Sequence, residues 1–115
     1  MHEPVPDRKP QVIELLQLLA SEERQLAYER DVPHVDITAE LVCMWFNDTY
    51  HPGDKFFASC FSEGEQAALA QFHTFYQERS HRLPESRGTV HTWLASPAWR
   101  EIMAEASKTL EKLQA

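Results

Sequence analysis

The chain has 115 residues, of which 43% are hydrophobic and 25% charged, and this size and balance suit one globular domain. Its net charge of −7 argues against a nucleic-acid partner, because phosphate binding needs clustered lysine and arginine. The longest apolar clusters, such as LVCMWF, are far shorter than a membrane-spanning helix, so we expect no membrane partner either.

The first ten residues, MHEPVPDRKP, are polar and rich in proline, and they contain no apolar run typical of a signal peptide. We expect residues 1–6 to be disordered and residues 1–115 to form a single helical domain. Two cysteines without a secretory signal are expected to stay reduced. The sequence therefore predicts a cytoplasmic protein.

A first helix is expected to begin near Asp7, which can cap it, with Pro10 tolerated in its opening turn. Its apolar residues project onto one side as far as Ala20. Beyond that point the pattern weakens, and Ser21 can start a second, short helix after a bend. Pro33 ends the segment, because a residue before proline is disfavoured in the α region.

The next helix is expected from about Asp36 or Thr38 to Asn47. Its apolar side chains cover much more than half of the helical wheel, which is typical of a central helix. Pro52 and Gly53 then mark a turn.

Ser62 and Glu65 fit a capping box at the start of another helix, which we expect to run to about Leu83. A short helical turn is predicted from Thr89 to Leu94.

Ser96 and Pro97 supply an N-cap and a first-turn proline for the last helix, whose apolar residues recur every three or four positions. The three tryptophans, Trp45, Trp93 and Trp99, lie on or beside apolar helix faces, so we expect them in the core. The whole pattern predicts an all-α, compact single-domain bundle of about four main helices plus one or two short helical turns.

Both cysteines lie in the stretch CMWFNDTYHPGDKFFASC, where Cys43, His51 and Cys60 are separated by eight and nine positions. Structural zinc sites usually have pairs of ligands with two to five residues between them, and Cys43, His51 and Cys60 form no such pair. We therefore predict no metal and no cofactor. An enzyme or a metal-binding protein that uses these three residues stays open as an alternative.

Asp48 is an unexpected acid in this stretch, because an α-helical projection places it on the apolar side near a helix C-terminus. The helix could end before Asp48 and leave it to cap the following turn. Alternatively, Asp48 pairs with an arginine such as Arg79, or it belongs to a binding site.

Acidic residues are concentrated in the first half of the chain. From Glu14 to Glu65 there are eleven acids and three bases, whereas the remainder is nearly balanced. Such a surface can simply keep the protein soluble, or it can steer a partner of opposite charge.

The function that this pattern favours is a small, non-catalytic protein-binding module for a partner with a basic surface, such as an immunity or inhibitor protein would have. A structural subunit of a homo-oligomer is a further alternative. Aromatic residues in the loop would supply an apolar anchor, although they could instead fold under the turn and cover the core. The candidate partner-binding residues are Asp31, Asp36, Glu40, Asp48, Tyr50, Asp54, Phe56 and Phe57.

Overall fold

The computed structural model describes residues 7–84 and 89–114, so the disorder expected for residues 1–6 lies outside the described part. The described residues form seven α-helices and one π-helical segment, without a β-strand, which confirms the predicted all-α class. In chain order these are α1 (Lys9–Ala20), α2 (Glu22–Asp31), α3 (Ile37–Cys43), η1 (Met44–Thr49), α4 (Lys55–Ser59), α5 (Glu63–Ser80), α6 (Val90–Leu94) and α7 (Pro97–Gln114).

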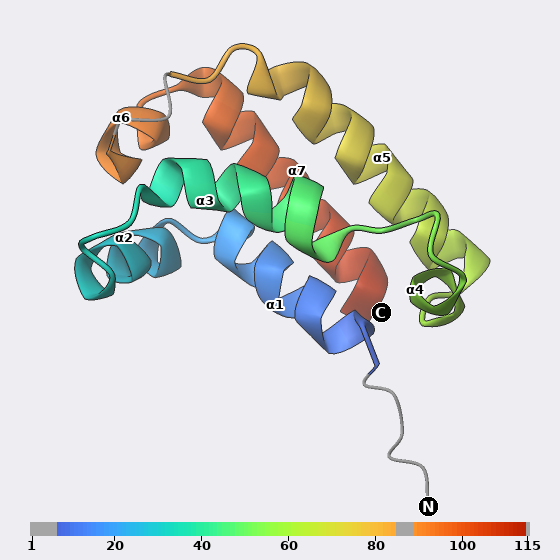
Figure 1. Cartoon of the computed structure of the whole chain (residues 1–115). Helices are drawn as coiled ribbons and strands as arrows, with labels where there is room; N and C mark the ends of the chain where they lie inside the picture. Colours follow the sequence, from blue (N-terminus) through green and yellow to red (C-terminus); the bar gives the residue numbers. More distant parts are fainter. Residues whose placement is uncertain (1–6, 85–88, 115) are drawn as a thin grey trace, which may run out of the picture.

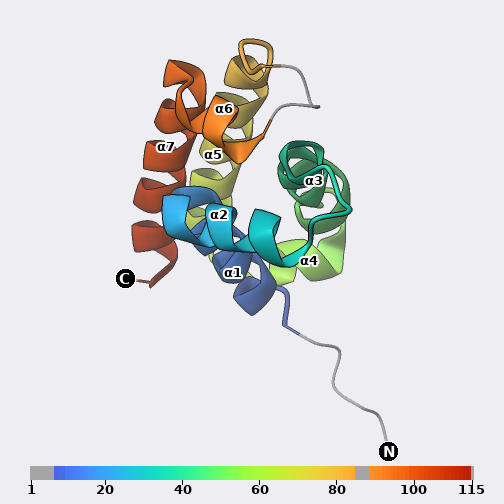
Figure 2. The ribbon, with the colours of Figure 1, turned by 90° about the vertical axis from the view of Figure 1, so that its left-hand side faces the viewer.

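The long C-terminal helix α7 is the centre of the packing, and its most extensive contacts are with α1 and α5 (Figure 1). The α3 helix continues into η1, and η1 packs against α1. At one end of the molecule α6 contacts α2, α3 and α7 (Figure 2). Within the part of the chain that is described, no helix is both long and apolar enough to cross a membrane.

Most of the predicted helix starts are confirmed. Ser21 is extended and accepts a hydrogen bond from the Arg24 N–H at 3.1 Å, so it bends the chain between α1 and α2. Ser62 and Glu65 form the reciprocal capping box. The α5 helix ends at Ser80, earlier than expected, and Pro84 has no N–H that could donate to the Ser80 carbonyl in a continued helix.

The predicted central helix changes its geometry after Cys43, where the π-helical segment η1 begins. Its closing hydrogen bond runs from Tyr50 N–H to the Trp45 carbonyl at 3.1 Å, a spacing of five residues instead of four. Each residue of a π turn therefore rotates the chain by a smaller angle than in an α-helix. The α-helical projection fails for Asp48 for this reason, and its side chain is exposed.

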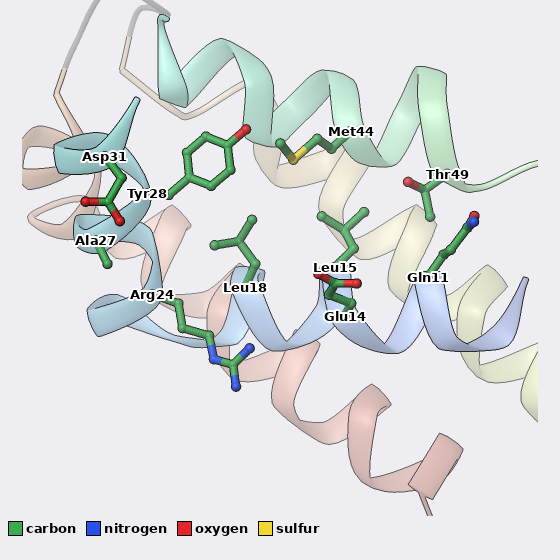
Figure 3. Close-up of a pocket in the computed structure, with 10 residues that line it drawn as sticks. All are labelled: Gln11, Glu14, Leu15, Leu18, Arg24, Ala27, Tyr28, Asp31, Met44 and Thr49. Carbon is green, nitrogen blue, oxygen red and sulfur yellow. The ribbon is translucent and has the colours of Figure 1, made fainter. Parts of the chain in front are cut away.

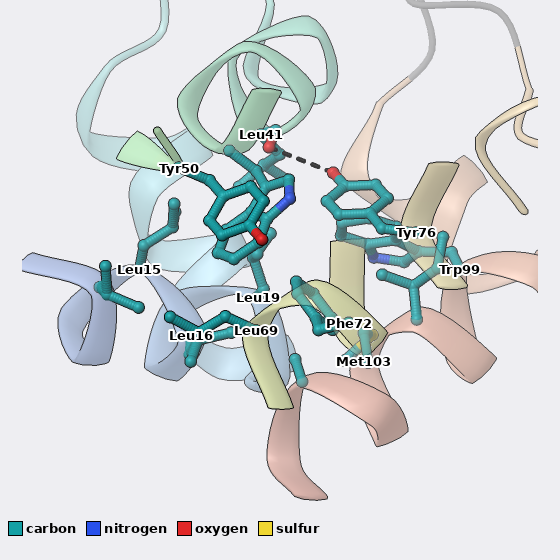
Figure 4. Packing of buried hydrophobic residues seen from close by; sticks show 14 of the residues in the cluster. Leu15, Leu16, Leu19, Leu41, Tyr50, Leu69, Phe72, Tyr76, Trp99 and Met103 are labelled. Atoms are coloured by element: carbon teal, nitrogen blue, oxygen red, sulfur yellow. Dashed lines mark hydrogen bonds between the residues drawn. The ribbon is translucent and has the colours of Figure 1, made fainter. Parts of the chain in front are cut away.

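The core is built around aromatic side chains from η1, α5 and α7 (Figure 4). Trp45 stacks on Tyr50 with ring centroids 4.8 Å apart, and it meets Phe72 edge-on at 4.9 Å. The buried hydroxyl of Tyr76 donates to the Leu41 carbonyl at 3.1 Å and so ties α5 to α3. All three tryptophans are buried, as predicted.

Candidate functional site

A surface groove of about 480 Å³ lies between α1, α2 and η1. Each of the first two helices presents residues at positions i, i+3, i+4 and i+7, which share one helix face. The groove is lined by Gln11, Glu14, Leu15 and Leu18 from α1, by Arg24, Ala27, Tyr28 and Asp31 from α2, and by Met44 and Thr49 from η1 (Figure 3).

The bend at Ser21 gives the groove its shape, because it turns the lining face of α2 toward that of α1. Gln25 holds this bend from inside the protein. Its side-chain amide donates to the carbonyls of Leu18 and Leu19, both at 3.1 Å, and its oxygen accepts from the Trp99 indole N–H at 2.9 Å. The geometry of the groove is therefore tied directly to the core.

The floor of the groove is apolar. Leu15 is buried, whereas Leu18, Tyr28 and Met44 are half-buried and keep part of their surface accessible. The Tyr28 ring lies between α2 and η1, with its hydroxyl directed toward the Met44 side (Figure 3). Such a hollow suits an apolar side chain of a ligand, and its volume falls within the usual range for binding sites of about 300–1,000 Å³.

The rim of the groove carries mostly negative charge. Glu14 and Asp31 line it directly, together with the single cation Arg24. Glu40 and Asp48 lie four residues before and after Met44 in the sequence, but neither is among the residues that line the groove. Arg30 is the other nearby cation and pairs with Asp31 at 3.3 Å. Among the residues that line the groove, two carboxylates therefore lie with one guanidinium group, and Arg30 partly balances the charge of Asp31.

Two of the predicted acidic residues have a structural role. Asp36 accepts from the Ala39 N–H at 3.2 Å and caps α3, and Asp54 accepts from the Phe56 N–H at 2.9 Å and caps α4. Both carboxylates are exposed, but their charge is partly balanced by the helix dipoles. Asp31, Glu40 and Asp48 are not helix caps in this structure.

Tyr50 and Phe57 follow the alternative in which the loop aromatics fold under the turn and cover the core, and not the alternative of an exposed anchor. Tyr50 is only 9% exposed and Phe57 only 4%, so both belong to the core, while Phe56 is half-buried. The chain turns inward here because Tyr50 stacks on Trp45. One edge of Tyr50 and of Phe57 lines a second, smaller hollow of about 290 Å³ beside α5, so these rings form walls and do not protrude.

Asp48 does not pair with Arg79, contrary to one of the explanations considered from the sequence. The Arg79 side chain donates instead to Glu101 at 2.8 Å, and its guanidinium carbon lies 3.4 Å from the centre of the Phe75 ring. The helix also does not end before Asp48, because η1 continues to Thr49. The structure thus supports neither the capping role nor the pair with Arg79, and the third explanation, a binding role for Asp48, is a proposal.

The residues of the alternative metal or enzyme site are not brought together as ligands. Across residues 7–84 and 89–114, no group of three or more histidine, cysteine, aspartate or glutamate side chains is arranged to hold a metal ion. Cys43 and His51 are exposed, whereas Cys60 is half-buried and its thiol donates to the Phe56 carbonyl at 3.4 Å. The geometry therefore does not favour a metal site built from these residues.

The chain matches no protein-family model, and no curated protein or solved structure is similar to it at a significant level.

The groove was not predicted from the sequence, although the sequence contains part of the information needed to find it. Leu15, Leu18 and Tyr28 are apolar residues on faces that also carry Glu14 and Asp31. The sequence does not show that the bend at Ser21 brings together these two helix faces, each of which carries both apolar and acidic residues.

One histidine, His73, is packed against the aromatic core and accepts a hydrogen bond there. The Trp45 indole N–H donates to Nδ1 of His73 at 3.2 Å, and the His73 ring also contacts Phe46 and Tyr50. Burial lowers the pKa of His73 below its usual value. A protonated His73 could not accept the hydrogen bond from Trp45.

We expect the free energy of unfolding to fall as the pH drops from about 7.5 to 5, because the unfolded chain, with a histidine pKa near 6.5, binds this proton more readily than the folded chain. In the variant His73→Gln, which keeps a hydrogen-bond acceptor, this loss should be smaller. Urea unfolding followed by tryptophan fluorescence at both pH values measures it. The exposed His81 supplies the control, since His81→Gln should keep the wild-type pH dependence. If His73→Gln kept the wild-type pH dependence of the free energy of unfolding, protonation of His73 would not be its cause.

Proposed function

We propose that the chain is a binding module for another protein with a basic surface, and that the partner docks on the side of the molecule formed by α1, α2 and η1. The observation that carries this proposal is the groove, whose apolar floor is bordered by more carboxylates than cations. An apolar centre with a charged border is the usual anatomy of a protein-binding site.

Two further features support a binding role. Val35 is the exposed large hydrophobic residue of the described chain, 38% accessible, and it lies between Asp31 and Asp36 in the loop that joins α2 to α3. The groove is also bordered by a π-helical segment, and π turns are frequent at functional sites. An exposed apolar side chain and acidic residues are thus neighbours in the sequence outside the groove as well.

Site-specific photo-crosslinking tests the proposal. A benzophenone amino acid is introduced at Val35, which lies between Asp31 and Asp36 in the sequence, and at Gln77, which is exposed on α5 and does not line the groove. We expect a partner with a basic surface to crosslink from position 35 and not from position 77. Crosslinks from both positions alike, crosslinks only between copies of this chain, or a partner without a basic surface would each contradict the proposal.

A further inference from the structure

We infer that the groove between α1, α2 and η1 binds a short segment of the partner in which one or two apolar side chains are flanked by lysine or arginine. This inference rests on the proposed function and specifies its ligand. It concerns the chemistry that the groove selects, whereas the proposed function concerns only the presence and the charge of a protein partner.

The length of the groove limits the size of its ligand. On α1 the lining residues extend from Gln11 to Leu18, which corresponds to about 10 Å at a rise of about 1.5 Å per residue. An extended chain covers this distance with about three residues, at about 3.3 Å each. The groove therefore holds a short motif, and not the face of a long helix.

The floor selects an apolar side chain. Leu15, Leu18 and Met44 present hydrocarbon and thioether groups, and the Tyr28 ring covers one end (Figure 3). Methionine adapts its shape to different apolar ligands, so the floor tolerates more than one aliphatic side chain.

The ends of the groove select positive charge beside that apolar side chain. Asp31 lies at the Tyr28 end and Glu14 lies along α1, so a cation on either side of a central apolar residue finds a carboxylate (Figure 3). The opposing cation, Arg24, is already in contact with the Gln17 side-chain oxygen at 3.5 Å. Arg24 is the only cation among the lining residues, and Arg30, which lies next to Asp31 in the sequence, is paired with it at 3.3 Å. A second copy of the chain carries a net charge of −7.

Methyl NMR of methionine-labelled protein detects the binding of a peptide in the groove directly. Met44 lines the groove, whereas Met103 is buried on α7 and serves as an internal control. The probes are three acetylated and amidated tetrapeptides: Lys-Leu-Leu-Lys, Lys-Ser-Ser-Lys and Glu-Leu-Leu-Glu. We expect Lys-Leu-Leu-Lys to shift the Met44 methyl signal saturably while the Met103 signal stays in place. The other two peptides should bind at least tenfold more weakly.

Variants of the groove test separately its apolar floor and its acidic residues. Leu18→Gln, which makes the floor polar, and Ala27→Leu, which fills the groove from α2, should each weaken the peptide at least fivefold. Two such variants keep the test valid if one of them unfolds. Glu14→Gln combined with Asp31→Asn should also weaken it, by threefold or more. The exposed Glu78 on α5 is the matched control, and Glu78→Gln should leave the affinity unchanged.

The outcomes separate this inference from the proposed function. Equal binding of Lys-Leu-Leu-Lys and Lys-Ser-Ser-Lys, or no shift of Met44 with any peptide, would overturn the inference about the groove. Neither result would affect crosslinking of a basic partner from Val35, which tests the proposed function separately. Tight binding of Glu-Leu-Leu-Glu would overturn the assigned charge preference.

Discussion

Replacement of Gln25 by alanine should lower the free energy of unfolding by about 3–5 kcal/mol, one of the largest effects expected for a single polar residue in this chain. Gln25 is fully buried and forms three hydrogen bonds, to the Leu18 and Leu19 carbonyls and from the Trp99 indole. Its removal leaves buried polar groups without partners, at a cost of about 1–3 kcal/mol each, and creates a cavity beside Trp99.

Urea unfolding followed by tryptophan fluorescence measures this loss. Gln77→Ala on α5 is the control, because Gln77 is exposed and its replacement should change the free energy of unfolding by no more than about 0.5 kcal/mol. A loss of less than about 1 kcal/mol in Gln25→Ala would show that the buried hydrogen bonds do not hold the α1–α2 bend.

Neutralisation of the acidic surface should slow association with the basic partner by about 10- to 1,000-fold at low salt, the usual range for electrostatic steering. The test variant combines Glu14→Gln, Asp31→Asn, Glu40→Gln and Asp48→Asn, the carboxylates of α1, α2, α3 and η1 that form this acidic surface. The dissociation rate should change less than the association rate.

A control variant removes the same number of negative charges from helices that do not line the groove. It combines Glu63→Gln, Glu78→Gln, Glu105→Gln and Glu111→Gln on α5 and α7. Because both variants have the same net charge, a difference between their association rates reports where the charge lies. Equal rates for the two variants, measured by stopped-flow or surface binding, would argue against a defined acidic docking surface.

Much of the fold could be predicted because its signals are local. Ser21, Ser62 and Pro97 mark helix starts through hydrogen bonds and backbone restrictions that involve only neighbouring residues. The apolar stripe of α7 identified the side that it buries, since an amphipathic helix carries this information in its own sequence.

The π-helical segment could not be predicted from helical periodicity. A wider turn is stabilised here by contacts between distant parts of the chain, such as the Trp45 indole with His73 and the Trp45 ring with Phe72. The misplacement of Asp48 follows directly from the resulting change in rotation per residue.

The candidate site was predicted only in part, for a similar reason. The acidic character of the segment that contains Asp31 and Asp48 is a property of the sequence. The inward position of Tyr50 and Phe57, and the joining of α1 and α2 into one groove, depend on tertiary packing and on the buried contacts of Gln25.

The proposed function is tested most directly by the rate at which the chain associates with the basic partner identified by crosslinking, measured as a function of salt concentration. Raising the ionic strength from about 0.01 to 0.15 M shortens the electrostatic screening length from about 30 Å to about 8 Å. If the acidic surface steers the partner, the association rate of the wild-type chain should fall at least about tenfold over this range. An association rate that stays within about twofold would contradict the proposal that this chain recognises its partner through charge.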